Sequence, residues 1–212
     1  MLTLYDNPVS SNALKVRFLL AELGLEYERR YVPFARPRPE WLTSFHPLGT
    51  IPAIDDGRVR LAESNAILRY MAHRERRYDL YPEDPADRAP VDWALDTWST
   101  EIRPGLYALE MAALFYSDSD DWETGGGPAE DANEEAVARA VPQAVAALER
   151  FESFLSGADI VLDRLTIADC AAAPALWRSF RLPLSLERFP KVAHLRGSLS
   201  ARPSFAAAGP AG

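Results

Sequence analysis

The sequence predicts an α/β domain followed by an all-helical domain. Strand signals occur only in the first third of the chain, where they alternate with helical patterns. Helical spacing without strand signals follows. Between the two parts, residues 78–90 carry three prolines and mixed charges, which is typical of a linker. We therefore expect an α/β domain at residues 1–77, a linker at 78–90 and a helical domain at 91–212.

The first predicted elements are a strand and a helix. Residues 2–5 (Leu-Thr-Leu-Tyr) favour a short strand that Asp6-Asn7-Pro8 ends. Residues 13–23 place apolar side chains at helical spacing, and Gly24 suits the position just after a helix. Three candidate N-caps precede this helix: Ser10, Ser11 and Asn12.

The rest of the first domain completes a known order of elements. A second strand is predicted at 27–33, a short helix at 41–45, a hairpin at 52–59 and a helix at 64–74. The resulting order, βαβαββα, is that of the thioredoxin-like fold.

The second half is predicted to be helical throughout. Residues 86–116 form a long helical pattern that Arg103-Pro104-Gly105 interrupts, because a proline inside a helix removes a hydrogen bond. Further helices are expected at 134–155, 166–180 and 190–200. The acidic, glycine-containing segment 118–135 is expected to be a loop, and no role is assigned to it.

Composition excludes several classes of function. A net charge of -8 without a basic stripe argues against nucleic-acid and membrane-surface partners. The N-terminus lacks the charged start of a signal peptide, and the single Cys170 suits a reducing compartment, so we expect a cytoplasmic protein. Three scattered histidines and one cysteine predict no metal site.

The segment from Gly49 to Ile67 is the most informative part of the chain. It combines an Ile51-Pro52 bond, a short hairpin and a helix that begins near Glu63-Ser64. A cis proline there would leave backbone groups for an extended peptide, and a helix start offers N–H groups to a carboxylate. A peptide-like ligand with a free carboxylate is therefore predicted.

At this point the chain resembles the soluble glutathione S-transferases, and in particular their serine-type bacterial members. Four landmarks carry the resemblance: Pro8-Val9-Ser10, residues 47–52 (PLGTIP), Glu63-Ser64 and residues 165–169 (LTIAD). It spans nearly the whole chain, from Leu2 to about Phe205. It implies a first domain that binds glutathione, a second domain that forms much of the pocket for an electrophilic small molecule, and a homodimer.

The resemblance places the catalytic hydroxyl at Ser10. A thiol with a pKa of about 8.5 is mostly protonated at pH 7, and lowering that pKa by about two units takes roughly 2.7 kcal/mol. A hydroxyl that donates to the sulfur supplies part of this, because it stabilises the thiolate. Ser11 and Asn12 are the rival donors, and Tyr5 is a weaker one.

The same resemblance assigns the glutathione site. The backbone of Ile51, before a cis Pro52, would pair with the cysteinyl residue, with Thr50 beside it. Glu63 and Ser64 would hold the γ-glutamyl end.

Charged side chains would complete this site. Arg36 and Arg38 are candidates for the glycyl carboxylate, because the arginine fork suits that group. Asp96 is a candidate to reach the γ-glutamyl amine across a dimer, with a solvated helix face as the alternative.

The resemblance also assigns the second-substrate pocket. Its candidates are Val9, Phe34, Arg103, Tyr107 and Trp177, although helix-spaced aromatics such as Tyr107 and Trp177 also suit a core.

Thr166 and Asp169 are interpreted as a structural capping box, with aspartate in place of the usual glutamate.

Two other functions stay open at this stage. Isomerases of the maleylacetoacetate type carry a Cys and a Trp in the run where this chain has Asn12 and Leu14. A non-catalytic binding module on the same fold is the second alternative.

Overall fold

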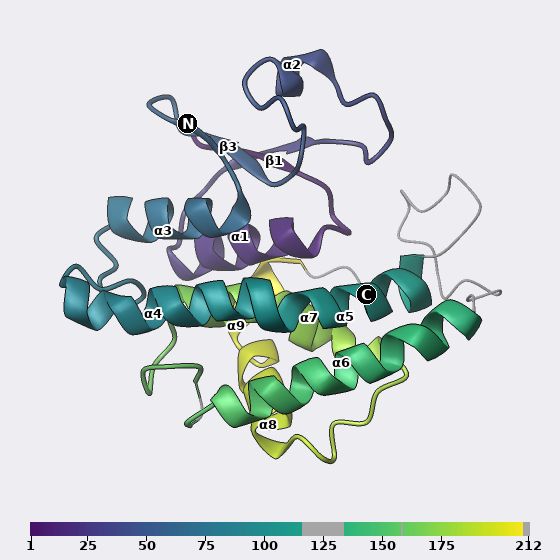
Figure 1. Cartoon of the computed structure of the whole chain (residues 1–212). Coiled ribbons are helices and arrows are strands. Elements are labelled where there is room, and N and C mark those ends of the chain that lie inside the picture. Colours follow the sequence, from purple (N-terminus) through teal and green to yellow (C-terminus); the bar gives the residue numbers. More distant parts are fainter. Residues whose placement is uncertain (116–133, 158, 210–212) are drawn as a thin grey trace.

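The computed structural model describes residues 1–115, 134–157 and 159–209 (Figure 1). The predicted acidic loop 118–135 lies outside these ranges except for Glu134 and Glu135. None of the described helices combines the length and the apolar character that crossing a membrane requires.

A four-stranded sheet organises the first half of the chain. Its order is β2 (Glu28–Tyr31), β1 (Thr3–Asp6), β3 (Ala53–Asp55) and β4 (Arg60–Ala62). Strand β1 runs parallel to β2 and antiparallel to β3, so that Leu4 pairs with Arg29 on one side and with Ile54 on the other. Helix α1 (Ser11–Glu22) connects the two parallel strands, as the sequence predicts.

Helices cover both faces of this sheet. Helices α1 and α3 (Ser64–Arg74) lie on one face, and the short α2 (Glu40–Thr43) lies on the other (Figure 1). Leu42 of α2 packs with Tyr5, Val32 and Ala53 in a small core of its own. The predicted thioredoxin-like order of elements is therefore confirmed.

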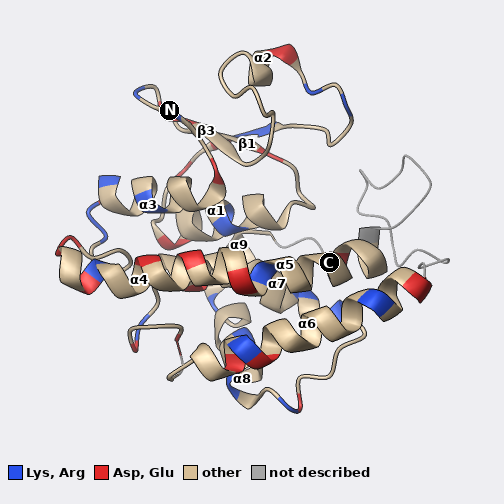
Figure 2. Ribbon diagram, in the orientation of Figure 1, with Lys and Arg blue, Asp and Glu red and all other residues tan. Residues whose placement is uncertain are grey.

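The described part of the second half is helical. It comprises α4 (Pro85–Thr97), α5 (Arg103–Glu110), α6 (Glu134–Phe154), α7 (Ile167–Arg178), α8 (Pro190–Ser200) and α9 (Pro203–Ala207). Helix α7 is buried along almost its whole length and packs against α1, which joins the two halves through one continuous core. Acidic and basic positions both occur along α4, α5 and α6 (Figure 2).

The start of the helical half agrees with the helical pattern predicted from residue 86. Helix α4 begins at Pro85, inside the segment 78–90 that the sequence marks as a linker. Oδ1 of Asp84 accepts hydrogen bonds from the N–H groups of Ala86 and Asp87, at 2.8 and 3.3 Å. Proline is well suited to the first helical position, so prolines here start a helix rather than prevent one.

The predicted interruption near Pro104 takes the form of a π-helical turn at Trp98–Ile102, and a second such turn follows α5 at Met111–Phe115. Gly105 lies where α5 crosses α6. A Cβ atom there would come within 2.8 Å of the Gln143 carbonyl oxygen and 2.9 Å of the Ala147 Cβ. Glycine is therefore required for this close approach of the two helices.

Candidate functional site

The turn before α1 is fixed by a buried asparagine. Asn7 donates through Nδ2 to the Val32 carbonyl at 3.2 Å, and its Oδ1 accepts from the Val9 N–H at 3.1 Å. Ser10 then adopts the N-cap conformation, and its Oγ accepts from the Ala13 N–H at 3.2 Å. Of the three predicted N-cap candidates, Ser10 is thus the cap, and its hydroxyl proton stays available for another acceptor.

A cleft of about 340 Å³ opens beside this turn, between the two halves of the chain. Ser10, Ser11 and Asn12 all line it. Residues from the loops of the first half and from the helices of the second half complete its walls: Val9, Phe34, Arg38, Thr50, Ile51, Tyr107, Glu110, Met111 and Arg178.

A smaller hollow of about 140 Å³ adjoins the cleft and shares Asn12, Thr50 and Ile51 with it. Pro52, Glu63 and Ser64 complete its wall. The two hollows therefore adjoin each other, and together we call them the groove; residues at the start of α1 and at the start of α3 line it.

Two cis peptide bonds lie close to this groove. Ile51-Pro52 is cis, as the resemblance implies, and Arg36-Pro37 is also cis, which was not expected. Beside the first of them, Thr50 Oγ1 lies 2.7 Å from Nε2 of His46, a buried residue.

The start of α3 suits an anion. Ser64 is the first residue of the helix and is buried, whereas Glu63 before it is exposed and has a φ of 69°. A non-glycine residue with positive φ is costly and often marks a functional position. The first N–H groups of the helix, which have no partner within it, and the Ser64 hydroxyl can together bind a carboxylate.

The structure separates the candidates for the other charged contacts. Arg38 lines the cleft, donates to the Pro33 carbonyl and lies over the Phe34 ring at 5.5 Å. Arg36 is exposed and is not among the lining residues.

Asp96 lies on α4, away from both hollows. It pairs with Arg69 at 2.9 Å, and the same guanidinium binds Asp92 at 2.7 Å. This geometry corresponds to the predicted alternative of a solvated helix face within one chain.

Three of the five candidates for the second-substrate pocket lie at the cleft. Val9, Phe34 and Tyr107 line the cleft, whereas Arg103 and Trp177 do not. The Trp177 ring instead packs against Phe180 and Phe205, at centroid distances of 5.3 and 6.1 Å.

The rotation of α7 explains why Trp177 is absent from the cleft wall, because it turns the neighbouring Arg178 toward the cleft instead. Arg103 lies behind the wall, with its guanidinium 4.9 Å from the centroid of the Tyr107 ring.

A buried ionic cluster that the sequence did not predict lies in the wall of the cleft. Glu110 is 1% exposed, and its Oε2 lies 2.8 Å from Nη2 of Arg103 and 3.9 Å from Nη1 of Arg178. Arg103 also donates to Oγ of Ser11 at 3.1 Å, and Arg178 donates to the Val9 carbonyl. The sequence does contain one sign of this cluster: Glu110 stands among apolar residues of α5, and a buried carboxylate requires a partner.

Lys15 is a second residue that the sequence analysis misses. It lies on α1, is 5% exposed, and donates through Nζ to Oγ of Ser64 at 3.5 Å. Burial, and then the nearby Arg103 charge, lower the pKa of Lys15 to about 7.

The predicted capping box has the structural role expected of it. Thr166 Oγ1 accepts from the Ala168 N–H at 3.3 Å, and Asp169 Oδ2 accepts from the Thr166 N–H at 2.8 Å. Asp169 Oδ1 also accepts from the Ile160 N–H at 2.9 Å. The pair therefore starts α7 and ties the preceding loop to it.

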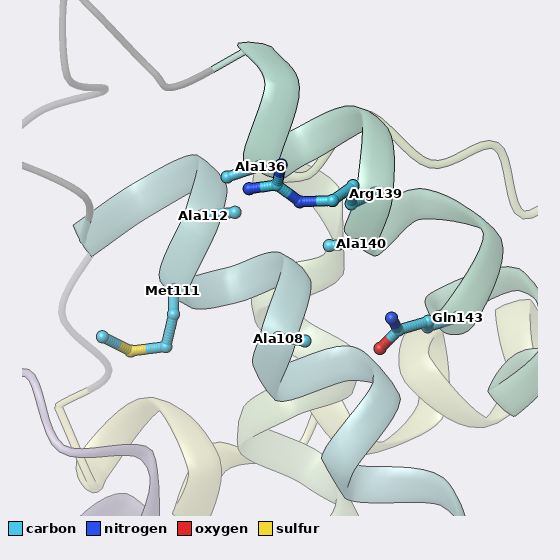
Figure 3. Close-up of a pocket in the computed structure, with 7 residues that line it drawn as sticks. All are labelled: Ala108, Met111, Ala112, Ala136, Arg139, Ala140 and Gln143. Atoms are coloured by element: carbon cyan, nitrogen blue, oxygen red, sulfur yellow. The ribbon is translucent and has the colours of Figure 1, made fainter.

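Another hollow, of about 350 Å³, lies between α5 and α6 (Figure 3). Its walls are largely alanine methyl groups, and Figure 3 shows Met111 pointing away from Arg139 and Gln143. Arg139 pairs with Glu135 at 2.5 Å. We assign no function to this hollow.

Among the described residues, no group of three or more His, Cys, Asp and Glu side chains is placed to hold a metal ion.

Comparison with known proteins identifies the family. The model of the glutathione S-transferase N-terminal domain matches residues 9–74, and that of the C-terminal domain matches residues 106–203. Glutathione S-transferase Z2 of Arabidopsis thaliana is 30% identical over 215 residues, which cover 96% of this chain and 88% of the relative. The maleylacetoacetate isomerase of Rhizobium meliloti (strain 1021) is 30% identical over 197 residues, which cover 88% and 85%.

Solved structures agree on the fold. A theta class glutathione S-transferase from Xanthomonas axonopodis pv. citri, with glutathione bound, superposes with a TM-score of 0.82 at 23% identity, covering 96% of this chain and 94% of that one. The two matching domain models, the full-length relatives and the shared architecture lead to one conclusion: the chain belongs to the glutathione S-transferase family.

Proposed function

We propose that this protein is a glutathione transferase in which the Ser10 hydroxyl activates the thiol of bound glutathione. The observation that carries the proposal is the groove formed by the two adjoining hollows, of which one is lined by Ser10 before α1 and the other by Ser64 at the start of α3. An extended tripeptide with a carboxylate at each end fits such a groove chemically.

Different residues of the groove would bind different parts of glutathione. Ser64 and the first N–H groups of α3 would take the γ-glutamyl carboxylate, and Glu63 its ammonium group. The Ile51 backbone before Pro52 would pair with the cysteinyl residue. Arg38 would take the glycyl carboxylate, and we prefer it to Arg36 because it lines the cleft.

Ser10 combines two roles without conflict. Its oxygen accepts from the Ala13 N–H, and its proton is free to donate to a sulfur in the cleft. A donor at this position stabilises the thiolate, and the positive end of α1 adds to the effect. Ser11 and Asn12 also line the cleft and stay as rivals, although Ser11 is already held by Arg103.

The far wall of the cleft would receive the electrophile. Val9, Phe34, Tyr107 and Met111 offer apolar and aromatic surface to a small molecule. The thiolate sulfur would bond to an electrophilic carbon, and the group displaced from that carbon would leave with the bonding electrons.

We further propose that the protein is a cytoplasmic homodimer. Asp96 would reach the γ-glutamyl amine in the partner's site only if its ion pair with Arg69 broke.

A glutathione-dependent isomerase is the second candidate. It is favoured by the relative in Rhizobium meliloti, a maleylacetoacetate isomerase with 30% identity. Arg178 also places a cation at the cleft wall, which suits an anionic substrate. Against it, Asn12 and Leu14 replace a Cys and a Trp that such isomerases carry.

Retention on immobilised glutathione, followed by turnover assays, tests the proposal. We expect retention, and thioether formation with a general aromatic electrophile that Ser10→Ala reduces at least tenfold without loss of retention. Isomerisation of maleylacetoacetate without thioether formation would favour the second candidate. Retention without turnover of either substrate would favour a binding module, and failure of retention would contradict all three.

A further inference from the structure

A buried lysine lies directly behind the proposed γ-glutamyl site. Lys15 reaches from α1 to α3, where its Nζ donates to Ser64 Oγ at 3.5 Å. Ser64 also lines the smaller hollow, so the same residue contacts the lysine and the space proposed for the ligand. The chain contains only two lysines, Lys15 and the distant Lys191, and its other basic residues of permanent charge are arginines. A lysine, unlike an arginine, can lose its proton readily when buried.

We propose that Lys15 is a positioning residue for the ligand carboxylate: it directs the Ser64 hydroxyl proton into the groove and takes up a proton when an anionic ligand binds there. This inference rests on the proposed binding of glutathione. A charged ammonium group can only donate, so Ser64 must accept from it and turn its own proton toward the ligand. A neutral amine can accept the Ser64 proton, and the hydroxyl would then turn away from the groove.

The surrounding charges make the lysine responsive to a bound anion. Arg103 on α5 disfavours the ammonium form, whereas Glu110 on α5 and Glu63 before α3 favour it. Arg178 on α7 lies 3.9 Å from Glu110. The α9 segment Pro203–Ala207 contains no ionisable side chain, and charged residues of α3 pair elsewhere: Arg69 with Asp92 and Asp96, and Arg74 with Asp56.

Burial lowers the pKa of Lys15 to about 7, so the amine is largely neutral in the free protein at pH 8. A carboxylate on the far side of Ser64 would add a negative charge nearby and raise that pKa. Binding would then be linked to proton uptake. Affinity for the ligand would fall as the pH rises above 7, because the ammonium form becomes scarce.

Lysine-selective NMR and calorimetry test this directly, with S-methylglutathione as the probe. The probe lacks a thiol, so thiol ionisation contributes nothing. Protein labelled with ¹³C at lysine Cε should give two side-chain signals, and Lys15→Arg assigns them. We expect the Lys15 signal to titrate near pH 7 without the probe and at least one pH unit higher with it, whereas the Lys191 signal keeps its midpoint.

Calorimetry in buffers of different ionisation enthalpy provides the second readout. At pH 8 we expect uptake of about 0.8 proton per bound probe if the pKa rises by about two units. Lys15→Arg should bind with no such uptake, because its cation is permanent, and Lys15→Met should bind at least tenfold more weakly at pH 6. Lys191→Met should behave like the wild type.

Two results would overturn the inference. Binding of the probe with an unmoved Lys15 midpoint would refute it while leaving the proposed function intact. Wild-type proton uptake in Lys15→Arg would refute it as well. Absence of any probe binding would instead refute the proposed function, and this inference with it.

Discussion

The guanidinium of Arg103 donates to Oγ of Ser11 at 3.1 Å, although the two residues lie 92 positions apart in the chain. This hydrogen bond joins α5 in the helical half to the first residue of α1. The same guanidinium binds the buried Glu110, so the wall of the cleft and the start of α1 share one ionic cluster. Glu110 is therefore central to the packing of the two halves.

Removing one partner of this cluster should be strongly destabilising. We expect Arg103→Met to lower the free energy of unfolding by about 3–5 kcal/mol, because Glu110 keeps a buried charge and loses its 2.8 Å ion pair, while the pair with Arg178 is longer at 3.9 Å. Urea denaturation measures this loss. Arg139→Met, which removes an exposed pair with Glu135, is the control and should cost less than about 1 kcal/mol. Equal effects of the two variants would show that the buried cluster adds nothing.

We expect Glu63 to contribute to glutathione binding and to lower the stability of the folded protein. Its φ of 69° is unfavourable for a side chain with a Cβ, and glycine adopts it freely. We expect Glu63→Gly to raise the free energy of unfolding by about 1 kcal/mol and to weaken glutathione binding at least tenfold. Thermal unfolding and calorimetry measure the two effects. Glu63→Gln, which keeps a Cβ, should weaken binding without the gain in stability. Undiminished affinity in both variants would remove Glu63 from the site.

The capping box should contribute substantially to the stability of the helical half. Asp169→Ala would leave the buried N–H groups of Ile160 and Thr166 without their acceptor. We expect a loss of about 3 kcal/mol, measured by urea denaturation. Replacing the exposed Glu187 by alanine should change stability by less than about 0.5 kcal/mol. A similarly small effect at Asp169 would mean that water satisfies both N–H groups.

Lys15 should make the stability of the free protein depend on pH. The folded-state pKa is about 7, below that of an unfolded chain at about 10.4, so the unfolded state binds more protons between these values. Lys15 therefore costs the folded protein no stability above about pH 10.4, and the cost grows as the pH falls to 7. We expect Lys15→Met to be more stable than the wild type by on the order of 3–4 kcal/mol at pH 7, with the difference vanishing near pH 10. A pH-independent difference between the two proteins would contradict this assignment.

Local sequence signals predicted much of this architecture. The helix at Ser64–Arg74 and the Thr166–Asp169 capping box each depend on a few neighbouring residues, so the sequence reveals them directly. The cis Pro52 was expected from the family resemblance and not from its neighbours alone. The helical pattern predicted from residue 86 is also confirmed, because Asp84 and Pro85 start α4 one residue earlier, within the segment 78–90 that was expected to be a linker.

Residues that depend on long-range packing were beyond this kind of prediction. Trp177 and Arg178 are neighbours, and only the rotation of α7 against α1 decides which of them faces the cleft. Glu110 and Lys15 acquire their roles from partners far along the chain, such as Arg103 and Ser64. Sequence spacing within one helix does not contain that information.

The central claim is that the Ser10 hydroxyl stabilises the thiolate of bound glutathione. Its most direct test is ultraviolet titration of the bound thiol in wild-type protein, Ser10→Ala, Ser10→Thr and Ser11→Ala. We expect a wild-type thiol pKa about two units below the free value of about 8.5, a return toward the free value in Ser10→Ala, and recovery in Ser10→Thr. Ser11→Ala should match the wild type. A bound thiol pKa that stays low in Ser10→Ala, and rises instead in Ser11→Ala, would contradict the account.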